Sequence, residues 1–222
     1  MATNRMAKLM QAKEPTAAPA APTRLLDLDL CTIVINLEGT TPFICHNWDK
    51  KNIEKMANKQ AGTASKGREK RDPIADYEGS FYRLPDGRPG MKVIAFKNAA
   101  VTAVTSLGKE FTKVGARQAF YILRDEIGGE LTPIHYPENS PPFMRTDTVT
   151  VGMGGTDLRY RPEFPLWGVS LKIQFNTRAI SQDQLINLIN LGGFAVGVGE
   201  WRVEKNGDNG RFTVVNKFSW EN

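Results

Sequence analysis

Residues 166–193 read LWGVSLKIQFNTRAISQDQLINLINLGG and contain the two clearest elements of the chain. In the first half, apolar side chains alternate with polar ones, which is typical of a strand with one buried face. The apolar set is Trp167, Val169, Leu171, Ile173 and Phe175. In the second half, Ser181 and Gln184 form a capping-box pattern that predicts the start of a helix. The pair Gly192-Gly193 is expected to end this helix.

Weaker patterns flank this strand and helix on both sides. Alternation predicts a strand at 31–38 and a final strand at 212–220, and small apolar residues at three- and four-residue spacing predict a helix at 95–107. Two further strands are expected at about 127–135 and 146–152, separated by a proline-containing loop, whereas 114–123 fits a short helix or a strand. The principal elements then follow the order βαββαβ, so we expect an α+β, ferredoxin-like domain.

The predicted domain spans residues 24–222 and has a long basic insertion, residues 46–90, after its first strand. Residues 1–23 are rich in Ala and Pro and have no periodic apolar face, so we expect a disordered N-terminal arm. An arm that docks on a neighbouring subunit is the alternative for this segment.

Composition restricts the chemistry of the chain. Two cysteines among 222 residues cannot form a disulfide framework and fit a reducing compartment, which predicts a cytoplasmic protein. Two histidines leave little material for a metal site or for histidine-based catalysis, so we expect no metal, no cofactor and no enzymatic activity. There is no apolar run of about 18 residues, and a transmembrane helix is therefore not expected.

The positive charge is concentrated in one place. The chain has 29 basic and 24 acidic residues, a net charge of +5, and the segment 46–71 alone holds eight basic residues and three acids. Such a segment either contacts phosphates or is a solvated surface loop. As a helix it would place Lys51, Lys55 and Lys59 on one face. Its candidate nucleic-acid-binding residues are Lys50, Lys51, Lys55, Lys59, Lys66, Arg68, Lys70 and Arg71.

A second candidate site is the segment 191–215, LGGFAVGVGEWRVEKNGDNGRFTVV. A glycine cluster lets the backbone approach a ligand and present its N–H groups. Basic side chains lie among the glycines to meet phosphates, and Trp201 offers a stacking face. The alternative is a glycine-containing hairpin with an ordinary turn at 205–210. The candidate residues are Gly197, Gly199, Trp201, Arg202, Lys205, Gly210 and Arg211.

A helix followed by a glycine-rich loop and a final Gly-Arg-Phe strand resembles the signature of the RAMP superfamily, the ferredoxin-like RNA-binding subunits of CRISPR effector complexes. The phrase MKVIAFKNAA at 91–100 is similar to the start of the first helix in that family, and the phrase GGFAVGVGEWRVEKNGDNGRF also resembles a group of uncharacterised bacteriophage proteins. The loop here carries three acids that the RAMP loop usually lacks.

The resemblance implies a non-enzymatic protein that binds single-stranded RNA or DNA without sequence preference, as a self-associating filament or multi-subunit complex in a bacterial host cell. In the loop, the residues that match this role are Gly197, Gly199, Arg202, Lys205, Gly210 and Arg211. The alternative function is a virion structural or assembly protein, in which the arm and the glycine-rich hairpin make subunit contacts. Arg159 and Arg161 share one face of a predicted strand and either bind phosphate or pair with Asp157 and Glu163, and we favour the ion pairs.

Overall fold

The computed structural model describes residues 28–47, 50–62, 71–107, 111–124, 128–151 and 154–221. At its centre is a four-stranded antiparallel sheet in the order β10-β1-β9-β5. Its strands are β1 (Leu30–Gly39), β5 (Phe120–Ile122), β9 (Gly168–Asn176) and β10 (Phe212–Val215). The predicted arm, residues 1–23, lies outside the described residues.

The strands β1 and β9 confirm the alternation seen in the sequence. Ile35 pairs with Leu171 and Leu37 pairs with Val169, and all four side chains are buried. Between them, Asn36 faces Ser170 on the other side of the sheet, where its side chain accepts a hydrogen bond from the Ser170 hydroxyl at 2.8 Å. One face of this sheet therefore carries the core.

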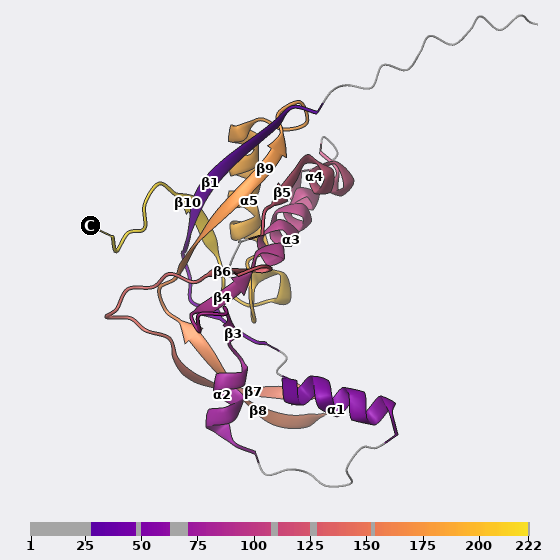
Figure 1. The fold of residues 1–222 in the computed structure, drawn as a ribbon, viewed down its shortest axis with the longest axis vertical. Helices are drawn as coiled ribbons and strands as arrows, with labels where there is room; N and C mark the ends of the chain where they lie inside the picture. The colour runs from indigo at the N-terminus through magenta and orange to yellow at the C-terminus, as the bar shows by residue number, and fades with distance from the viewer. Residues whose placement is uncertain are drawn as a thin grey trace, which may run out of the picture.

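Helices α3 (Val93–Ala103) and α5 (Gln182–Ala195) cover this apolar face, as Figure 1 shows. Ser181 caps α5 with the predicted capping box, since its side chain accepts from the Gln184 N–H and the Gln184 side chain accepts from the Ser181 N–H. A one-turn 3-10 helix, Val104–Leu107, extends α3. The segment that fitted a helix or a strand contains both, because α4 (Lys113–Ala119) leads directly into β5.

Gly192 and Gly193 lie inside α5, whereas the sequence predicted that they end it. A Cβ on Gly192 would be 2.7 Å from the backbone N of Ala100 in α3, and one on Gly193 would be 2.0 Å from the Phe212 carbonyl oxygen in β10. The two glycines thus allow α5 to approach the backbone of a helix and of a strand. The tertiary contact, and not a helix end, explains the pair.

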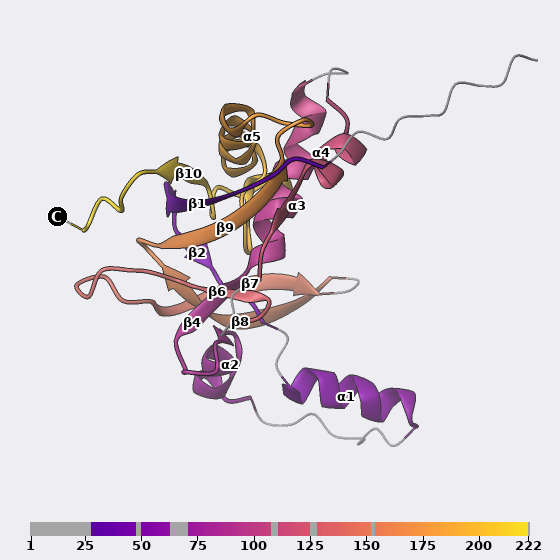
Figure 2. The ribbon, with the colours of Figure 1, turned by 45° about the horizontal axis from the view of Figure 1, so that its top comes forward.

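Two segments interrupt the order β1, α3, β5, β9, α5, β10. Between β1 and α3 lie β2 (Phe43–Ile44), α1 (Lys50–Gln60), α2 (Pro73–Gly79), β3 (Tyr82–Arg83) and β4 (Pro89–Lys92). Between β5 and β9 lie β6 (Leu131–Pro133), β7 (Phe143–Val151) and β8 (Gly155–Phe164). The strands of the two segments form two three-stranded sheets, β2-β8-β7 and β3-β4-β6, which lie below the central sheet in Figure 2. The expectation of an α+β chain is confirmed, and the strands of all three sheets pair antiparallel.

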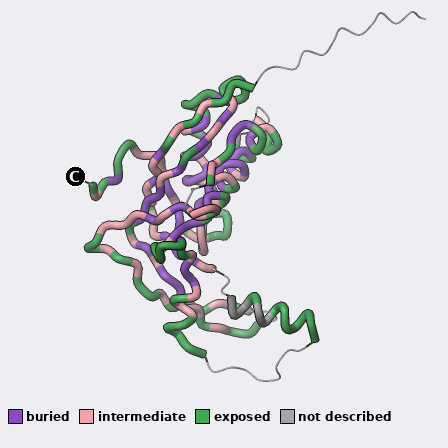
Figure 3. Tube along the Cα trace, in the orientation of Figure 1, coloured by how far each residue is buried: buried purple, intermediate pink, exposed green. Residues whose placement is uncertain are grey.

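Aromatic side chains join the central sheet to the sheet β2-β8-β7. The Trp167 ring lies 5.4 Å from Phe43 and 6.4 Å from Phe212, and its Nε1–H donates to the Thr41 carbonyl at 2.8 Å. Phe164 continues this cluster, 5.8 Å from Phe43 and 6.1 Å from Phe81. Figure 3 shows buried residues running from the central sheet through this junction, whereas the described residues of α1 are exposed.

The last strand is shorter than the sequence predicted. β10 ends at Val215, and the chain then crosses the end of β1, where the backbone N–H and the hydroxyl of Ser219 both donate to the Glu38 carboxylate. Phe218 is still buried, but against His135 and Trp220 rather than in a strand ladder. The alternation at 216–220 therefore reflects the burial of one side chain, Phe218, and the partial burial of Trp220 in a segment that is not a strand.

Substituting Gly193→Ala should lower the free energy of unfolding by about 1–3 kcal/mol, because the methyl group collides with the Phe212 carbonyl oxygen. At an exposed position of the same helix, Asn187→Ala should instead raise it by a few tenths of a kcal/mol, roughly the difference in helix propensity. Urea denaturation followed by circular dichroism measures both. A neutral Gly193→Ala variant would contradict the close packing of α5 on β10.

Candidate nucleic-acid interface

The glycine-rich loop, residues 196–211, connects α5 to β10 and contains a short 3-10 turn at Val203–Lys205. Gly199 and Gly210 have left-handed φ values of +79° and +69°. A Cβ on Gly199 would be 2.5 Å from the Phe43 ring, and one on Gly210 would be 1.7 Å from the Val198 carbonyl oxygen. The glycines are therefore required by the packing of the loop on itself and on β2.

The loop backbone donates many of its hydrogen bonds within the protein. The Val198 N–H donates to the Gly210 carbonyl at 2.9 Å, and the Gly210 N–H donates to the Pro42 carbonyl at 2.7 Å. The Glu200 N–H donates to the Ile44 carbonyl at 3.1 Å. These N–H groups are not available to a phosphate, in contrast to the expectation that the glycine cluster presents them to a ligand. The alternative hairpin is not formed either, since only a single parallel bridge joins Arg202 to Asn209.

Some side chains of the loop are already hydrogen-bonded within the protein, and others are exposed. Arg202 donates to the Glu204 carboxylate at 3.0 and 2.6 Å and to the Gly199 carbonyl at 3.2 Å, so its charge is already paired. Lys205 is exposed, and Trp201 is 45% exposed with a left-handed φ of 52°. An exposed indole on a fixed backbone suits base stacking.

Arg211 is coupled to an aromatic residue that the sequence did not indicate as part of a site. Its guanidinium lies 4.7 Å from the centre of the Phe194 ring, which is 65% exposed at the end of α5. This arrangement presents a cation and an aromatic face together on the surface. Phe194 was missed because a single Phe next to two glycines resembles a core residue.

A pocket of about 380 Å³ separates the glycine-rich loop from α3. It brings together three of the predicted residues, Gly197, Gly199 and Arg202. Asn98 and Thr102 of α3 line the opposite wall, and they were not predicted. The only sequence signal for this wall was the phrase at 91–100, which includes Asn98.

The basic segment, residues 46–71, is described in part. Its first half forms the helix α1, as the sequence predicted, and the described residues of this helix, including Lys59, are exposed. Figures 1 and 2 both show α1 at the end of the molecule remote from the central sheet. Lys50, Lys51 and Lys55 belong to the same helix. The predicted residues Lys66, Arg68 and Lys70 lie outside the described residues.

Arg71, the last residue of the basic segment, is committed to ion pairs. Its Nε donates to Asp76 at 2.6 Å, and Nη1 donates to Asp157 of β8. The hydrogen bond to Asp76 is the main reason why the pKa of Arg71 is raised above its ordinary value. Arg71 therefore attaches the end of this segment to α2 and β8. In the basic segment, the candidates for phosphate contact are the residues that precede Arg71.

A network of five charged side chains, which we call the charge network, joins β7 and β8 to the glycine-rich loop. Its centre is Arg161, whose side chain is only 4% exposed and donates to Asp147 at 2.7 Å and to Glu200 at 3.2 Å. Arg145 completes the network by donating to Asp147 and to Glu163, both at 2.7 Å.

The charge network partly corrects the predicted ion pairs. Arg159 does approach Asp157 at 3.4 Å, as expected. Arg161 does not pair with Glu163 but with Asp147 and Glu200, because Glu163 is bound by Arg145 on the neighbouring strand. Burial opposes ionisation of Asp147, yet hydrogen bonds and charge from Arg145 and Arg161 outweigh it and hold the pKa of Asp147 below its ordinary value.

Reactive side chains are few in the part of the chain that the structure describes. Burial raises the pKa of the Cys45 thiol to about 12, so it is protonated near neutral pH and donates to the Ser80 carbonyl. Among the described residues, no cluster of three or more His, Cys, Asp or Glu side chains is arranged to hold a metal ion. Within the same residues, no helix has the length and apolar character needed to cross a membrane.

Comparisons with known proteins find a likeness among solved structures but none among sequences. No family model and no curated protein matches the sequence. Among solved structures, the crystal structure of Cmr6 from Pyrococcus furiosus aligns with 85% of this chain and 100% of its own chain, with a TM-score of 0.41 and 9% sequence identity. A likeness at this level carries no argument about function.

Substituting Arg161→Met should lower the free energy of unfolding by about 3–5 kcal/mol, because Asp147 and Glu200 lose their shared buried partner. The matched control is Arg124→Gln, which breaks an exposed pair with Glu130 and should change stability by less than about 1 kcal/mol. Denaturant titration at neutral pH compares the two. Equal effects of both variants would show that the charge network adds no stability beyond that of a surface pair.

The pH dependence of stability should reveal the Asp147 carboxylate. Because its folded pKa lies below the ordinary value of 3.8, its stabilising contribution is complete above that value and is lost as the pH falls through the folded pKa. An Asp147→Asn variant should be less stable than the natural chain at neutral pH and should lose less stability in acid. Urea unfolding at a series of pH values tests this, and parallel acid limbs for the two proteins would contradict it.

Proposed function

We propose that this protein is a non-enzymatic binder of single-stranded nucleic acid that acts without sequence preference. The observation that carries the proposal is the helix α1, a lysine-rich element whose described residues are all exposed and which stands apart from the central sheet. The side chains of α1 whose burial is described, Ile53 and residues 56–60, are exposed, so this part of the helix contributes surface and not core. The helix α1 contains four of the lysines of the basic segment and one acid, Glu54, so its net charge is +3.

The spacing on α1 suits a phosphate backbone. Lys51, Lys55 and Lys59 repeat every four residues, which places them on one side of the helix about 6 Å apart along its axis. A single strand can adjust its phosphate spacing to a short row of cations because its backbone is flexible. Each contact releases counterions, so binding through this row is sequence-independent and depends on salt.

Exposed aromatic groups support a single strand over a duplex. Trp201 and Phe194 both present ring faces to solvent on or beside the glycine-rich loop, and Phe194 is accompanied by the Arg211 cation. Bases stack on such rings irrespective of their identity, but only when they are not already stacked within a duplex. We propose that the glycine-rich loop contacts the nucleic acid through these side chains, because many of its backbone N–H groups are hydrogen-bonded within the protein.

The topology of the central sheet agrees with this proposal. Read across the sheet, the strands are the fourth, first, third and second of the four in chain order, and α3 and α5 lie on one face. This order supports the proposed ferredoxin-like fold. That fold hosts many functions, so it supports the RAMP resemblance of residues 191–212 without deciding the function. Self-association on the nucleic acid and a role inside a bacterial host cell are further parts of the proposal.

The triple variant Lys51→Gln, Lys55→Gln and Lys59→Gln should weaken binding to labelled single-stranded RNA or DNA. If all three lysines contact phosphates, the slope of log affinity against log salt should fall in magnitude by about 2, from about 0.7 per contact on a single strand. Fluorescence anisotropy over a salt series measures the affinity and the slope, and parallel titrations with RNA, DNA and duplex establish the preferred strand.

The matched control removes three exposed cations elsewhere: Lys113→Gln, Arg178→Gln and Lys217→Gln. It lowers the net charge by the same amount but leaves α1 intact, so it should keep most of the affinity and nearly the full slope. If both triple variants lost the same affinity, the loss would be explained by the lower net charge and not by α1. Absence of binding to any strand at low salt would overturn the proposed function.

An assembly protein is the second candidate, and the hairpin of β7 and β8 favours it. Met144 and Leu158 share one face of this hairpin and are 39% and 44% exposed, which gives apolar surface for a protein contact. The glycine-rich loop packs on β2 of its own chain and is not the free hairpin which that function expected. Assembly in the absence of nucleic acid, unaffected by the α1 variant, would favour this second function.

A further inference from the structure

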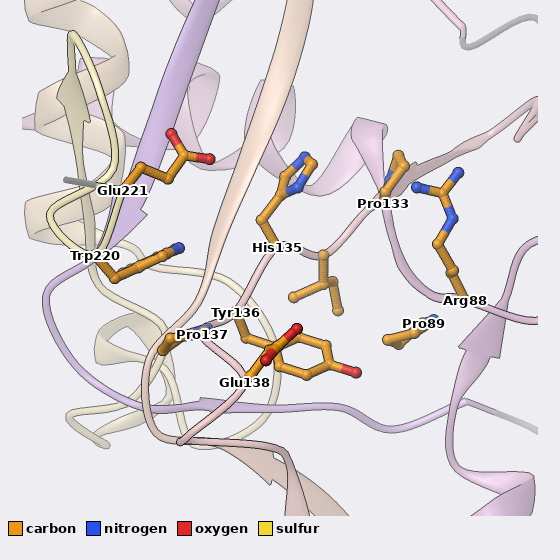
Figure 4. A pocket seen from close by; sticks show the side chains of 10 residues that line it. Arg88, Pro89, Pro133, His135, Tyr136, Pro137, Glu138, Trp220 and Glu221 are labelled. Carbon is orange, nitrogen blue, oxygen red and sulfur yellow. The ribbon is translucent and has the colours of Figure 1, made fainter.

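A second pocket, of about 480 Å³, lies between the start of β4, the segment that follows β6, and the C-terminal tail. Figure 4 shows Trp220 and Glu221 of the tail on one side, Tyr136 to Glu138 at the centre, and Arg88 on the opposite side. Its volume is within the usual range of ligand sites, about 300–1,000 Å³. Neither the glycine-rich loop nor α1 lines this pocket.

The pocket has aromatic walls that are held in place from behind. Trp220 stacks on Phe218 with ring centres 5.1 Å apart and planes inclined by 7°, and Phe218 is buried 5.4 Å from the His135 ring. Tyr136 is fixed edge-on against Phe164 at 5.8 Å. Rigid aromatic walls bind extended proline-containing peptides, since a polyproline II segment is already ordered and loses little entropy.

The charge of the pocket favours a basic ligand. Glu138 and Glu221 are exposed at its rim, and the Arg88 guanidinium is bonded to Asp86 at 2.7 and 2.8 Å. Burial lowers the pKa of His135, so this ring adds no positive charge near neutral pH. The lining therefore repels phosphate, which separates this pocket from the proposed nucleic-acid interface.

We propose that the pocket binds the proline-containing arm of a second copy of this chain, through residues 19–24. These residues read PAAPTR and contain two prolines separated by two alanines, the repeat that suits a polyproline II helix, followed by the cation Arg24. The prolines meet the rings of Tyr136 and Trp220, and Arg24 meets the carboxylates of Glu138 and Glu221. The arm carries four basic residues and one acid up to residue 24, which complements the acidic rim.

Chain length directs the arm to a neighbouring copy. The arm joins the fold at the start of β1, whereas the pocket lies beyond the other end of that strand, where Glu38 pairs with Gly168 and Gly168 pairs with His135. Leu30 and Glu38 are about 26 Å apart along the strand at about 3.3 Å per residue. Pro22 precedes Leu28 by six residues, about 19 Å of polyproline II, so it falls short of its own pocket.

The contact is then head to tail. The arm of one copy fills the pocket of the next, and each copy offers both an arm and a pocket, so the assembly grows as an open chain or closes as a ring. No nucleic acid takes part in this contact, so it stands or falls independently of the proposed function.

Sedimentation velocity of the full-length protein, freed of nucleic acid, tests the proposal over a concentration series. The natural chain should sediment faster as its concentration rises. An arm variant (Pro19→Ala, Pro22→Ala and Arg24→Gln) and a pocket variant (Trp220→Ala with Glu138→Gln) should each associate at least tenfold more weakly. Tyr121→Ala, which removes an exposed aromatic ring outside the pocket, should associate as the natural chain does.

Mixing the two variants provides the decisive comparison. The arm variant retains a pocket and the pocket variant retains an arm, so an equimolar mixture should form a two-chain species that does not grow further. The proposal is overturned if the natural chain stays monomeric, if the arm variant associates normally, or if the mixture remains monomeric. The arm variant changes no residue of the described fold, so its result holds even if Trp220→Ala impairs folding.

Discussion

The burial of the Trp167 indole is the contact on which the rest of the structure depends. Its ring lies at the point where β1, β2, β8, β9 and β10 converge, and its N–H is satisfied by the Thr41 carbonyl. Gly39 has no side chain because a Cβ there would overlap this ring, 2.1 Å from Nε1. The position of the turn after β1, and with it the position of β2 against the glycine-rich loop, therefore follows from one buried aromatic residue.

A second constraint holds the candidate interface in place. The charge network connects Glu200 in the glycine-rich loop to Arg161 on β8 and Asp147 on β7. The loop, which leads into β10 of the central sheet, is thereby also attached to the hairpin. Buried ion pairs add little net stability over apolar packing, but they tolerate only one arrangement of their partners. The network thus sets the orientation of the loop relative to β7 and β8, while exposed side chains such as Trp201 remain available for binding.

The sequence predicts the central elements well because each of them is a local pattern. Alternation reveals β1 and β9, and the capping box at Ser181 fixes the start of α5. Prediction from the sequence fails where a contact with a distant residue determines the structure. Gly192 and Gly193 look like a helix end, but they allow α5 to pack on Ala100 and Phe212. The same holds for the candidate site, since the pairing of Arg161 with Asp147 and Glu200 depends on three segments that only the fold brings together.

The position of β1 has a consequence for the synthesis of the chain on the ribosome. Both neighbours of this strand, β9 and β10, come from the last quarter of the sequence. At 5–20 residues per second, about 9 to 35 s pass between the synthesis of Gly39 and that of Val215. During this interval the segment of β1 lacks both of its partner strands, and the polar residues Thr32, Asn36 and Glu38 on one of its faces limit its tendency to pair with other nascent chains.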